Sequence, residues 1–233
     1  MPWVTALMLI SGIAVVAALY WNQNMTVQKV KVNALHYTDE AQIQQTASNT
    51  IGLNPDSVDL SLLVNQIEKF VYVKSVTPFI EPNGSLTLDI TEREPLALLI
   101  DGSSRIYVDE DGVRLPVLTG KSKDVPLLYG YSSAATADTL KDESFLQVRD
   151  FLLKAKENGF GWATISEIAF DEIEGVVALS HENGVKLLFG RNDFETKLEN
   201  WEAFYAEVIR TKGIQVMQQV DLRFSNQVVT RES

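Results

Sequence analysis

The feature that most constrains this chain is an uncharged run near its start, from Pro2 to Trp21. Nearly every side chain in the run is apolar, and about 20 residues at a helical rise of 1.5 Å each match a hydrocarbon core of roughly 30 Å. Trp3 lies at one end and Tyr20 with Trp21 at the other, as in the aromatic belts at membrane interfaces. The sequence therefore predicts a transmembrane helix and a membrane anchor over residues 1–24.

A cleaved signal peptide is the main alternative to a retained anchor. Val16-Ala17-Ala18 would offer a small-residue cleavage site. However, no basic region precedes the apolar run, which is longer than the ~7–15 apolar residues of a signal peptide. We therefore expect residues 1–24 to stay attached. Lys29 and Lys31 follow the run closely, and the positive-inside rule would place them in the cytoplasm, so charge alone does not orient the span.

The rest of the chain has the composition of a folded protein with an acidic surface. Of its 233 residues, 45% are apolar and 22% are charged, which suits one or two packed domains after the anchor. The formal net charge of −11 repels phosphate groups and anionic lipids, so we expect neither nucleic-acid binding nor electrostatic adhesion to a membrane. Because the chain has no cysteine, disulfides, thiolate catalysis and thiolate metal sites are excluded.

Residues 26–94 have the pattern of a small domain with the element order β-α-α-β-β. Alternating apolar and polar side chains indicate strands, and a capping residue before an apolar helical face indicates each helix. The expected elements are a strand at Val27–Val32, a helix that Thr38 caps and that ends near Asn49, a second helix capped by Ser57 or Asp59, and strands at Val71–Thr77 and Ser85–Thr91.

Residues 95–233 have a different pattern, with many short strands and two long helices. Asp-Gly and Asn-Gly pairs mark tight turns between the strands. The expected strands are Leu96–Ile100, Arg105–Val108, Val113–Pro116, Pro126–Gly130, Ile165–Asp171, Val176–His181, Val185–Gly190 and Gln218–Thr230. The expected helices are Asp142–Glu157 and Asp193–Lys212, and an aromatic stripe on the second, which includes Trp201 and Tyr205, is expected to face the core.

Several short motifs, in this order, resemble the FtsQ/DivIB family of bacterial cell-division proteins. The segment Thr91–Ala97 resembles the "-ERxPLA-" sequence that ends the POTRA domain of that family. Further segments of the same kind are Phe70–Val76, Arg105–Gly112, Val125–Gly130, Asn183–Gly190 and Val220–Phe224. Each motif alone is weak, and their common order along nearly the whole chain carries the resemblance.

The resemblance implies an α+β fold: an N-terminal transmembrane helix (residues 1–24), a POTRA-like β-α-α-β-β domain (26–94) and a mostly antiparallel β domain with two helices (95–233). It implies a divisome scaffold that binds FtsB-like and FtsL-like division proteins at the septum, without a cofactor, catalysis or a small-molecule substrate. The chain would cross the cytoplasmic membrane once, through Pro2–Trp21, with its bulk in the periplasm. Asp171 and Glu172 stand where some members are basic, so partner contacts of those basic positions are not carried over.

A POTRA-bearing factor in polypeptide transport or outer-membrane assembly is the alternative function. Such proteins usually carry several POTRA copies, or a long β-barrel built from alternating strands of ~10 residues. This chain has one POTRA-like unit, followed by a domain with two long helices. The pattern therefore favours the division protein.

Enzymatic and metal-binding functions are poorly supported. His36 and His181 are far apart in the sequence and lack the HExxH spacing of a zinc protease. No G-x-S-x-G or P-loop motif occurs. Asp109–Gly112 lacks the ligand spacing of an EF-hand and is expected to be a hairpin turn. Glu167, Asp171, Glu172 and Glu174 could supply paired glycosidase carboxylates, but a solvated strand edge is the simpler interpretation.

The expected partner site is the last strand, Gln218–Thr230, at a sheet edge. From Phe224 to Thr230 the sequence has neither proline nor charge, so nothing blocks pairing with a strand of a partner. Arg223 would pair with a partner carboxylate and Phe224 would be an aromatic anchor. The resemblance agrees, since the family binds FtsB through this strand. The alternative is an internal strand with Phe224 in the core. The predicted binding residues are Arg223, Phe224, Ser225, Asn226, Gln227 and Val228.

Strand pairing is also the expected contact of the POTRA-like domain, which we predict to be a recruitment module. Its candidate edges are Val27–Val32 and Val71–Thr77.

Overall fold

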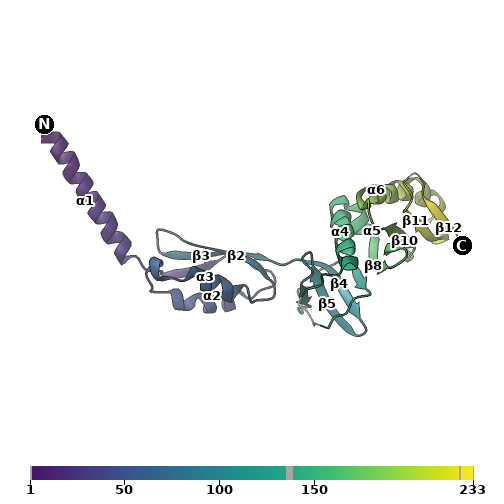
Figure 1. The fold of residues 1–233 in the computed structure, drawn as a ribbon, viewed down its shortest axis with the longest axis horizontal. Coiled ribbons are helices and arrows are strands. Elements are labelled where there is room, and N and C mark those ends of the chain that lie inside the picture. Colours follow the sequence, from purple (N-terminus) through teal and green to yellow (C-terminus); the bar gives the residue numbers. More distant parts are fainter. Residues whose placement is uncertain (1, 135–138, 226, 233) are drawn as a thin grey trace. The chain divides into compact units, whose positions relative to one another are not determined.

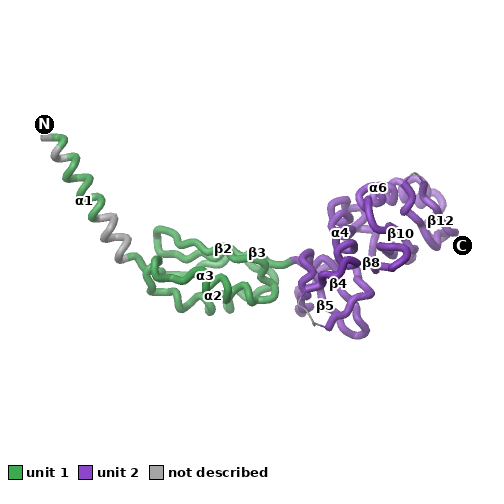
Figure 2. The backbone as a smooth tube through the Cα atoms, viewed as in Figure 1, with its two compact units in different colours: residues 1–93 green, residues 94–233 purple. Residues whose placement is uncertain are grey.

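The structure, a computed structural model, describes residues 2–134, 139–225 and 227–232, although not the side chains of residues 2, 5–6 and 17–24. The fold mixes α-helices and β-strands and divides into two compact units, residues 1–93 and 94–233 (Figure 2). Each unit has its own hydrophobic core.

The uncharged N-terminal run forms one helix, α1 (Pro2–Asn24). Its described apolar side chains, among them Trp3, Leu9 and Ile13, are exposed. No helix in the described part of the chain has the length and apolar character needed to span a bilayer. The side chains of Tyr20 and Trp21, which belong to the predicted aromatic belt, lie outside the described residues.

The remainder of unit 1 is a three-stranded sheet with two helices packed against it (Figure 1). The strands are β1 (Lys29–Val32), β2 (Val73–Ile80) and β3 (Ser85–Glu92), in the spatial order β1-β3-β2. β1 runs parallel to β3 and β2 runs antiparallel to it. The helices are α2 (Glu40–Ala47) and α3 (Leu60–Ile67), joined through 3-10 turns at Ser48–Thr50 and Pro55–Ser57. Their apolar faces meet the sheet at Ile43, Ala47, Leu63, Ile67, Val76, Leu86, Leu88 and Ile90.

The caps of the two helices are both aspartates. The Asp39 carboxylate accepts the N–H of Ala41, so the prediction that Thr38 caps α2 is wrong. The helix starts one residue later than predicted, at Glu40, so the extended N-cap position falls on Asp39, while the N–H of Thr38 donates to the carboxylate of Glu92. For α3, the structure decides between the two predicted caps in favour of Asp59, which accepts the N–H of Leu62.

Unit 2 is built on one nine-stranded sheet in the order β12-β11-β10-β9-β8-β7-β4-β5-β6. Of its eight neighbouring pairs among the described residues, five are antiparallel, and β4–β7, β7–β8 and β10–β11 are parallel. The strands are β4 (Pro95–Asp101), β5 (Ser104–Asp109), β6 (Arg114–Pro116), β7 (Leu127–Tyr129), β8 (Ile165–Asp171), β9 (Gly175–Ser180), β10 (Lys186–Gly190), β11 (Met217–Asp221) and β12 (Val229–Glu232).

Helices pack against this sheet to form the second core. They are α4 (Glu143–Asn158), the short α5 (Phe160–Thr164) and α6 (Phe194–Phe204), which continues through a π turn (Tyr205–Ile209) into α7 (Arg210–Lys212); a 3-10 turn (Ile214–Val216) follows. Trp201 is fully buried and its indole N–H donates to the Thr164 hydroxyl at 2.9 Å. The core contains Phe145, Val148, Phe151, Leu152, Ile168, Ala178, Leu187, Phe189, Leu198, Trp201, Val220 and Leu222.

Candidate functional site

The predicted C-terminal strand is two strands rather than one. β11 lies inside the sheet, parallel to β10 and antiparallel to β12. The prediction of a single strand over Gln218–Thr230 is therefore wrong, because the chain turns between Asp221 and Val229. Leu222 is fully buried and its N–H donates to the carbonyl of Leu188 at 2.9 Å, which fixes the chain at the start of the turn.

The edge of the sheet at this end is β12. Among the described residues β11 is its only strand neighbour, with Val220 opposite Thr230 and Asp221 opposite Val229. Val229 is 44% exposed. The last residue of β12, Glu232, is attached to the last residue of α7, Lys212. The ion pair joins Lys212 Nζ and Glu232 Oε1 at 2.7 Å. β12 is thus a short, anchored strand whose outer side has no strand neighbour in the described residues.

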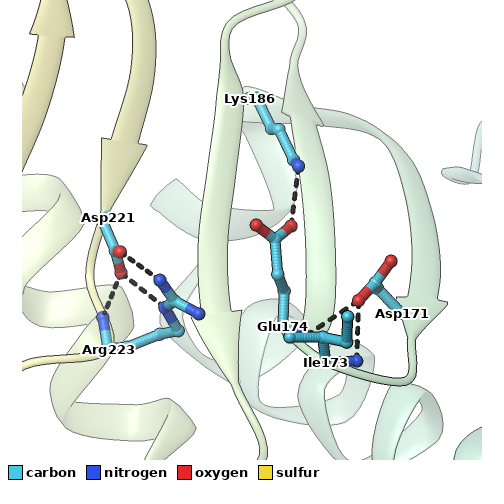
Figure 3. A network of polar contacts seen from close by, with 6 residues as sticks. All are labelled: Asp171, Ile173, Glu174, Lys186, Asp221 and Arg223. Carbon is cyan, nitrogen blue, oxygen red and sulfur yellow. Dashed lines mark hydrogen bonds and ion pairs between the residues drawn. The ribbon is translucent and has the colours of Figure 1, made fainter.

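Arg223 is engaged within the chain. Its Nε and a terminal nitrogen donate to the two Asp221 carboxylate oxygens at 2.8 and 2.5 Å, and its backbone N–H donates to the same carboxylate at 3.1 Å (Figure 3). Burial acts to raise the pKa of Asp221, but the Arg223 hydrogen bonds and charge lower it on balance. The pairing in turn raises the pKa of Arg223. The bidentate contact expected with a partner is therefore already made to Asp221, where it holds the turn.

The other predicted binding residues lie in or beside this turn. Phe224 is 44% exposed, so it is not the core residue of the alternative interpretation. Ser225 and Gln227 are exposed, and Val228 is half-buried against the core of unit 2. Asn226 lies outside the described residues. Phe224 and Val229 thus expose apolar surface on either side of a polar connection, next to the sheet edge.

An exposed isoleucine on a rigid turn was missed by the sequence analysis. Ile173, in the turn between β8 and β9, is 89% exposed. Asp171 Oδ1 accepts the N–H groups of Ile173 and Glu174, both at 2.8 Å, and these bonds lower the pKa of Asp171 (Figure 3). Glu174 also binds Lys186 Nζ at 2.6 Å. The sequence contains one signal for this turn: Asp171 lies two residues before Ile173, and aspartate side chains often accept the backbone N–H two residues later.

The carboxylates considered for catalysis have separate tasks. Asp171 closes its turn and Glu174 pairs with Lys186. Glu167 lines a separate groove of about 360 Å³ with Asp124, Trp162 and His181. Asp171 and Glu174 are therefore each accounted for by a local structural contact.

Metal-binding geometry is also absent from the described residues. They contain no cluster of three or more histidine or acidic side chains suited to a metal ion, and His36 and His181 are both exposed. Asp109 is buried and accepts the N–H groups of Asp111 and Val113 at 3.0 and 2.7 Å. The segment Asp109–Gly112 is therefore a turn closed by its own first carboxylate.

Several known proteins are similar to this chain. Residues 94–231 match the family described as FtsQ/DivIB, C-terminal related. The cell division protein FtsQ of Rhodothermus marinus is 27% identical over 237 residues, which covers 97% of this chain and 86% of that protein. FtsQ of Salinibacter ruber is 26% identical over 236 residues, covering 96% and 90%. The major extracytoplasmic domain of the cell division protein DivIB from Geobacillus stearothermophilus has 20% identity and a TM-score of 0.35, covering 52% of this chain and 97% of that one.

Proposed function

This chain belongs to the FtsQ/DivIB family, and from that membership we propose that it is a divisome scaffold that recruits and positions FtsB-like and FtsL-like partners at the septum. The members of this family are non-catalytic cell-division proteins. The observation that supports partner binding most directly is the edge strand β12, beside which Phe224 and Val229 are each 44% exposed.

The docking mode that we propose is strand addition to β12. An extended partner segment gains main-chain hydrogen bonds along an unpaired edge, and pockets for alternate side chains give specificity. Phe224 would be the aromatic anchor beside this edge, because aromatic residues are enriched among binding hot spots. Arg223 acts by holding the turn through Asp221, so its contribution to binding is indirect.

The test is to compare Phe224→Ala with Val117→Ala in the full chain. Val117 is also 44% exposed in unit 2 and follows β6, the strand at the opposite edge of the sheet. Phe224→Ala should weaken binding of an FtsB-like partner by about 2 kcal/mol, or roughly 30-fold, as expected for a hot spot. Val117→Ala should bind like the parent chain. Titration calorimetry gives the affinities and thermal melting checks folding.

The docking proposal would be wrong if a folded Phe224→Ala chain, and a folded chain truncated after Arg223, both bound the partner as tightly as the parent. A pull-down from a detergent extract of the cells asks the broader question of whether FtsB-like and FtsL-like proteins co-purify with the chain.

We also propose that residues 1–24 anchor the chain in the cytoplasmic membrane, with residues 26–233 in the periplasm. The support is the uncharged, apolar run from Pro2 to Trp21 and the exposed apolar side chains of α1. N-terminal sequencing of the mature protein should begin at or near Met1. A start near Leu19 would mean that the run is a cleaved signal peptide.

Residues 26–94 would then be a POTRA-like recruitment module and residues 95–233 an FtsQ-like β domain. The sheet order supports strand pairing in the first, since β1 and β2 are its two edge strands. A fluorescent fusion of the full chain should form midcell rings, and deletion of residues 26–94 should disperse them. A uniform envelope signal from the full chain would favour a transport or outer-membrane assembly factor, and midcell rings from the deletion would refute the recruitment role.

A further inference from the structure

Two apolar side chains are exposed on the loop that follows α2. Ile51 is 49% exposed and Leu53 is 44% exposed, on either side of Gly52. No charged residue occurs from Thr46 to Pro55. Burial of this loop in a less polar medium would therefore remove apolar surface from water without desolvating a charge.

The loop is bonded to the segment that follows α1. The N–H of Val27 donates to the carbonyl of Leu53 at 2.9 Å, and the N–H of Gly52 donates to the carbonyl of Val27 at 2.8 Å. Val27 lies three residues after the last residue of α1, Asn24. Because an extended residue covers at most ~3.6 Å and a helical one ~1.5 Å, the chain path from Trp21 to Val27 is roughly 15 Å or less.

Hydrogen bonds between residues close in the sequence fix the conformation of this loop. The N–H of Ile51 donates to the carbonyl of Ser48, the N–H of Leu53 donates to the carbonyl of Thr50, and the Thr50 hydroxyl donates to the carbonyl of Ala47. Gly52 has a φ of 85°, a left-handed conformation that glycine adopts at little cost. The two side chains are therefore presented by an ordered loop, so little conformational entropy is lost when they bind.

We propose that Ile51 and Leu53 form a second membrane contact, inserted into the interfacial layer of the bilayer that holds α1. This inference rests on the proposed anchor. The polar interfacial layer extends roughly 5–7 Å beyond the hydrocarbon on each side. The loop is hydrogen-bonded to Val27, close to the point at which the chain would leave this layer. Such a contact would fix the orientation of the three-stranded sheet and its helices relative to the membrane. A single helix followed by a short connection does not fix that orientation.

The contact is apolar rather than electrostatic. The acidic net charge of the chain disfavours adhesion to anionic lipid. Lys29 is the nearest exposed cation along the chain, and Lys31 is paired with Glu81 at 2.8 Å. Insertion of two aliphatic side chains should be insensitive to salt, whereas attraction between Lys29 and headgroups should be screened by it.

The absence of cysteine allows a test with one label at a time. Full-length Ile51→Cys and Leu53→Cys chains would carry an environment-sensitive nitrobenzoxadiazole label and be reconstituted into phosphatidylcholine vesicles that contain a lipid quencher near the headgroups. Both labels should show blue-shifted emission and strong quenching. Because both side chains are exposed and the loop is held by backbone bonds, the melting temperatures should match that of the parent chain.

Val71→Cys is the matched control within the same unit. Val71 is also 44% exposed, but it precedes Tyr72, whose carbonyl accepts the N–H of Arg93. Val71 thus lies near the last residue of β3, Glu92. The segment that follows α1 lies at the other end of β3, where the carbonyl of Gly84 accepts the N–H of Gln28. The eight residues of β3 separate the two ends by roughly 25 Å, at ~3.3 Å a residue. The Val71 label should remain in water, with red-shifted and unquenched emission.

A label at Leu9→Cys, in α1, separates failure of this inference from failure of the anchor. Quenching at Leu9 with water-like emission at Ile51 and Leu53 would overturn the second contact and leave the anchor standing. An unquenched Leu9 label would overturn both. Loss of the Ile51 and Leu53 quenching at high salt would also overturn the proposal, because it would assign the contact to charge.

Discussion

At the scale of single residues, several carboxylates accept backbone N–H groups. Asp109, Asp171 and Asp221 each close a turn in this way. Glu92 at the end of β3 does so over a long range, since it accepts the N–H groups of His36, Tyr37 and Thr38 at 2.5 to 3.1 Å. The acidic residues of this protein are therefore not only a solvated surface charge.

Glu92→Gln should destabilise unit 1 by about 1–3 kcal/mol at neutral pH, because an amide replaces a charged acceptor of several N–H groups. Burial acts to raise the pKa of Glu92, but hydrogen bonds from Thr38, His36 and Tyr37 lower it on balance. Its folded pKa is thus below the unfolded value of about 4.3. The contribution is present above that value and is lost as pH falls through the folded pKa.

Urea titrations from neutral to acid pH measure this contribution. Glu94→Gln is the control, since Glu94 is two residues away and its ion pairs with described residues are long, to Lys123 at 3.9 Å and to Lys156 at 3.7 Å. If both variants lost the same stability at neutral pH, the hydrogen bonds to Glu92 would not be its source.

The Asp221–Arg223 pair should show a measurable coupling energy. A double-mutant cycle with Asp221→Asn and Arg223→Gln should give about 1–2 kcal/mol, because the carboxylate is buried and the hydrogen bonds are bidentate. The same cycle on the exposed pair Lys212–Glu232 should give about 0.5 kcal/mol or less. Equal coupling in the two cycles would contradict the assignment of Arg223 as the residue that holds the turn.

At the scale of elements, long periodic segments were predictable. The helix expected at Asp142–Glu157 is α4, Glu143–Asn158, and it buries Phe145, Val148, Phe151, Leu152 and Ala155. Its apolar face repeats over four turns, and Asn158-Gly159 ends it with a φ of 71° at the glycine. A strong period together with a stop signal determines a helix locally.

The sequence predictions failed in segments where the local pattern of apolar and polar residues does not indicate which structure forms. The helix expected at Asp193–Lys212 contains a π turn at Tyr205–Ile209, which changes the hydrogen-bond spacing but not the composition. α5 is five residues long, too short for a periodic signal. The turn after Asp221 depends on the burial of Leu222 and on the carboxylate of Asp221, neither of which alternation reveals. The predicted partner-binding residues therefore lie in a connection rather than a strand.

Two hairpin glycines that each follow an aspartate should differ in how strongly substitution by alanine destabilises the chain. Gly102 (φ 59°) and Gly112 (φ 78°) both follow an aspartate, but only a Cβ at Gly112 would lie 2.3 Å from the carbonyl oxygen of Leu140. Gly102→Ala should cost about 1–2 kcal/mol from its left-handed backbone. Gly112→Ala should cost about 1–3 kcal/mol more through the clash. Equal losses in denaturant titrations would show that the contact with Leu140 relaxes freely.

At the scale of the whole molecule, the chain has two compact units with separate cores, which divide between Arg93 and Glu94. The mixed α and β composition was predictable from the sequence, and the family resemblance is confirmed by the match over residues 94–231. The partner residues stay predictions because they depend on contacts outside this chain. The assignment of residues 26–94 as a POTRA domain stays a prediction because the family match covers residues 94–231.

Separate cores predict separate unfolding transitions. Scanning calorimetry of the full chain in detergent should resolve two transitions, with Glu92→Gln lowering one and Gly112→Ala lowering the other. The physical reason is that each substitution disturbs contacts within one unit only. One transition that both variants shift together would show that the units unfold as one.

The parallel pairing of β1 with β3 has a mechanical consequence. The chain enters the three-stranded sheet at Lys29 and leaves it after Glu92. These two points lie at opposite ends of β1 and β3, whose register places Lys29 beside Ser85 and Val32 beside Leu88. A pull on those two points loads the ladder in shear, so its four residue pairs resist together instead of opening one after another. A link with this geometry transmits tension along its strands, and it unfolds only when all four residue pairs separate together.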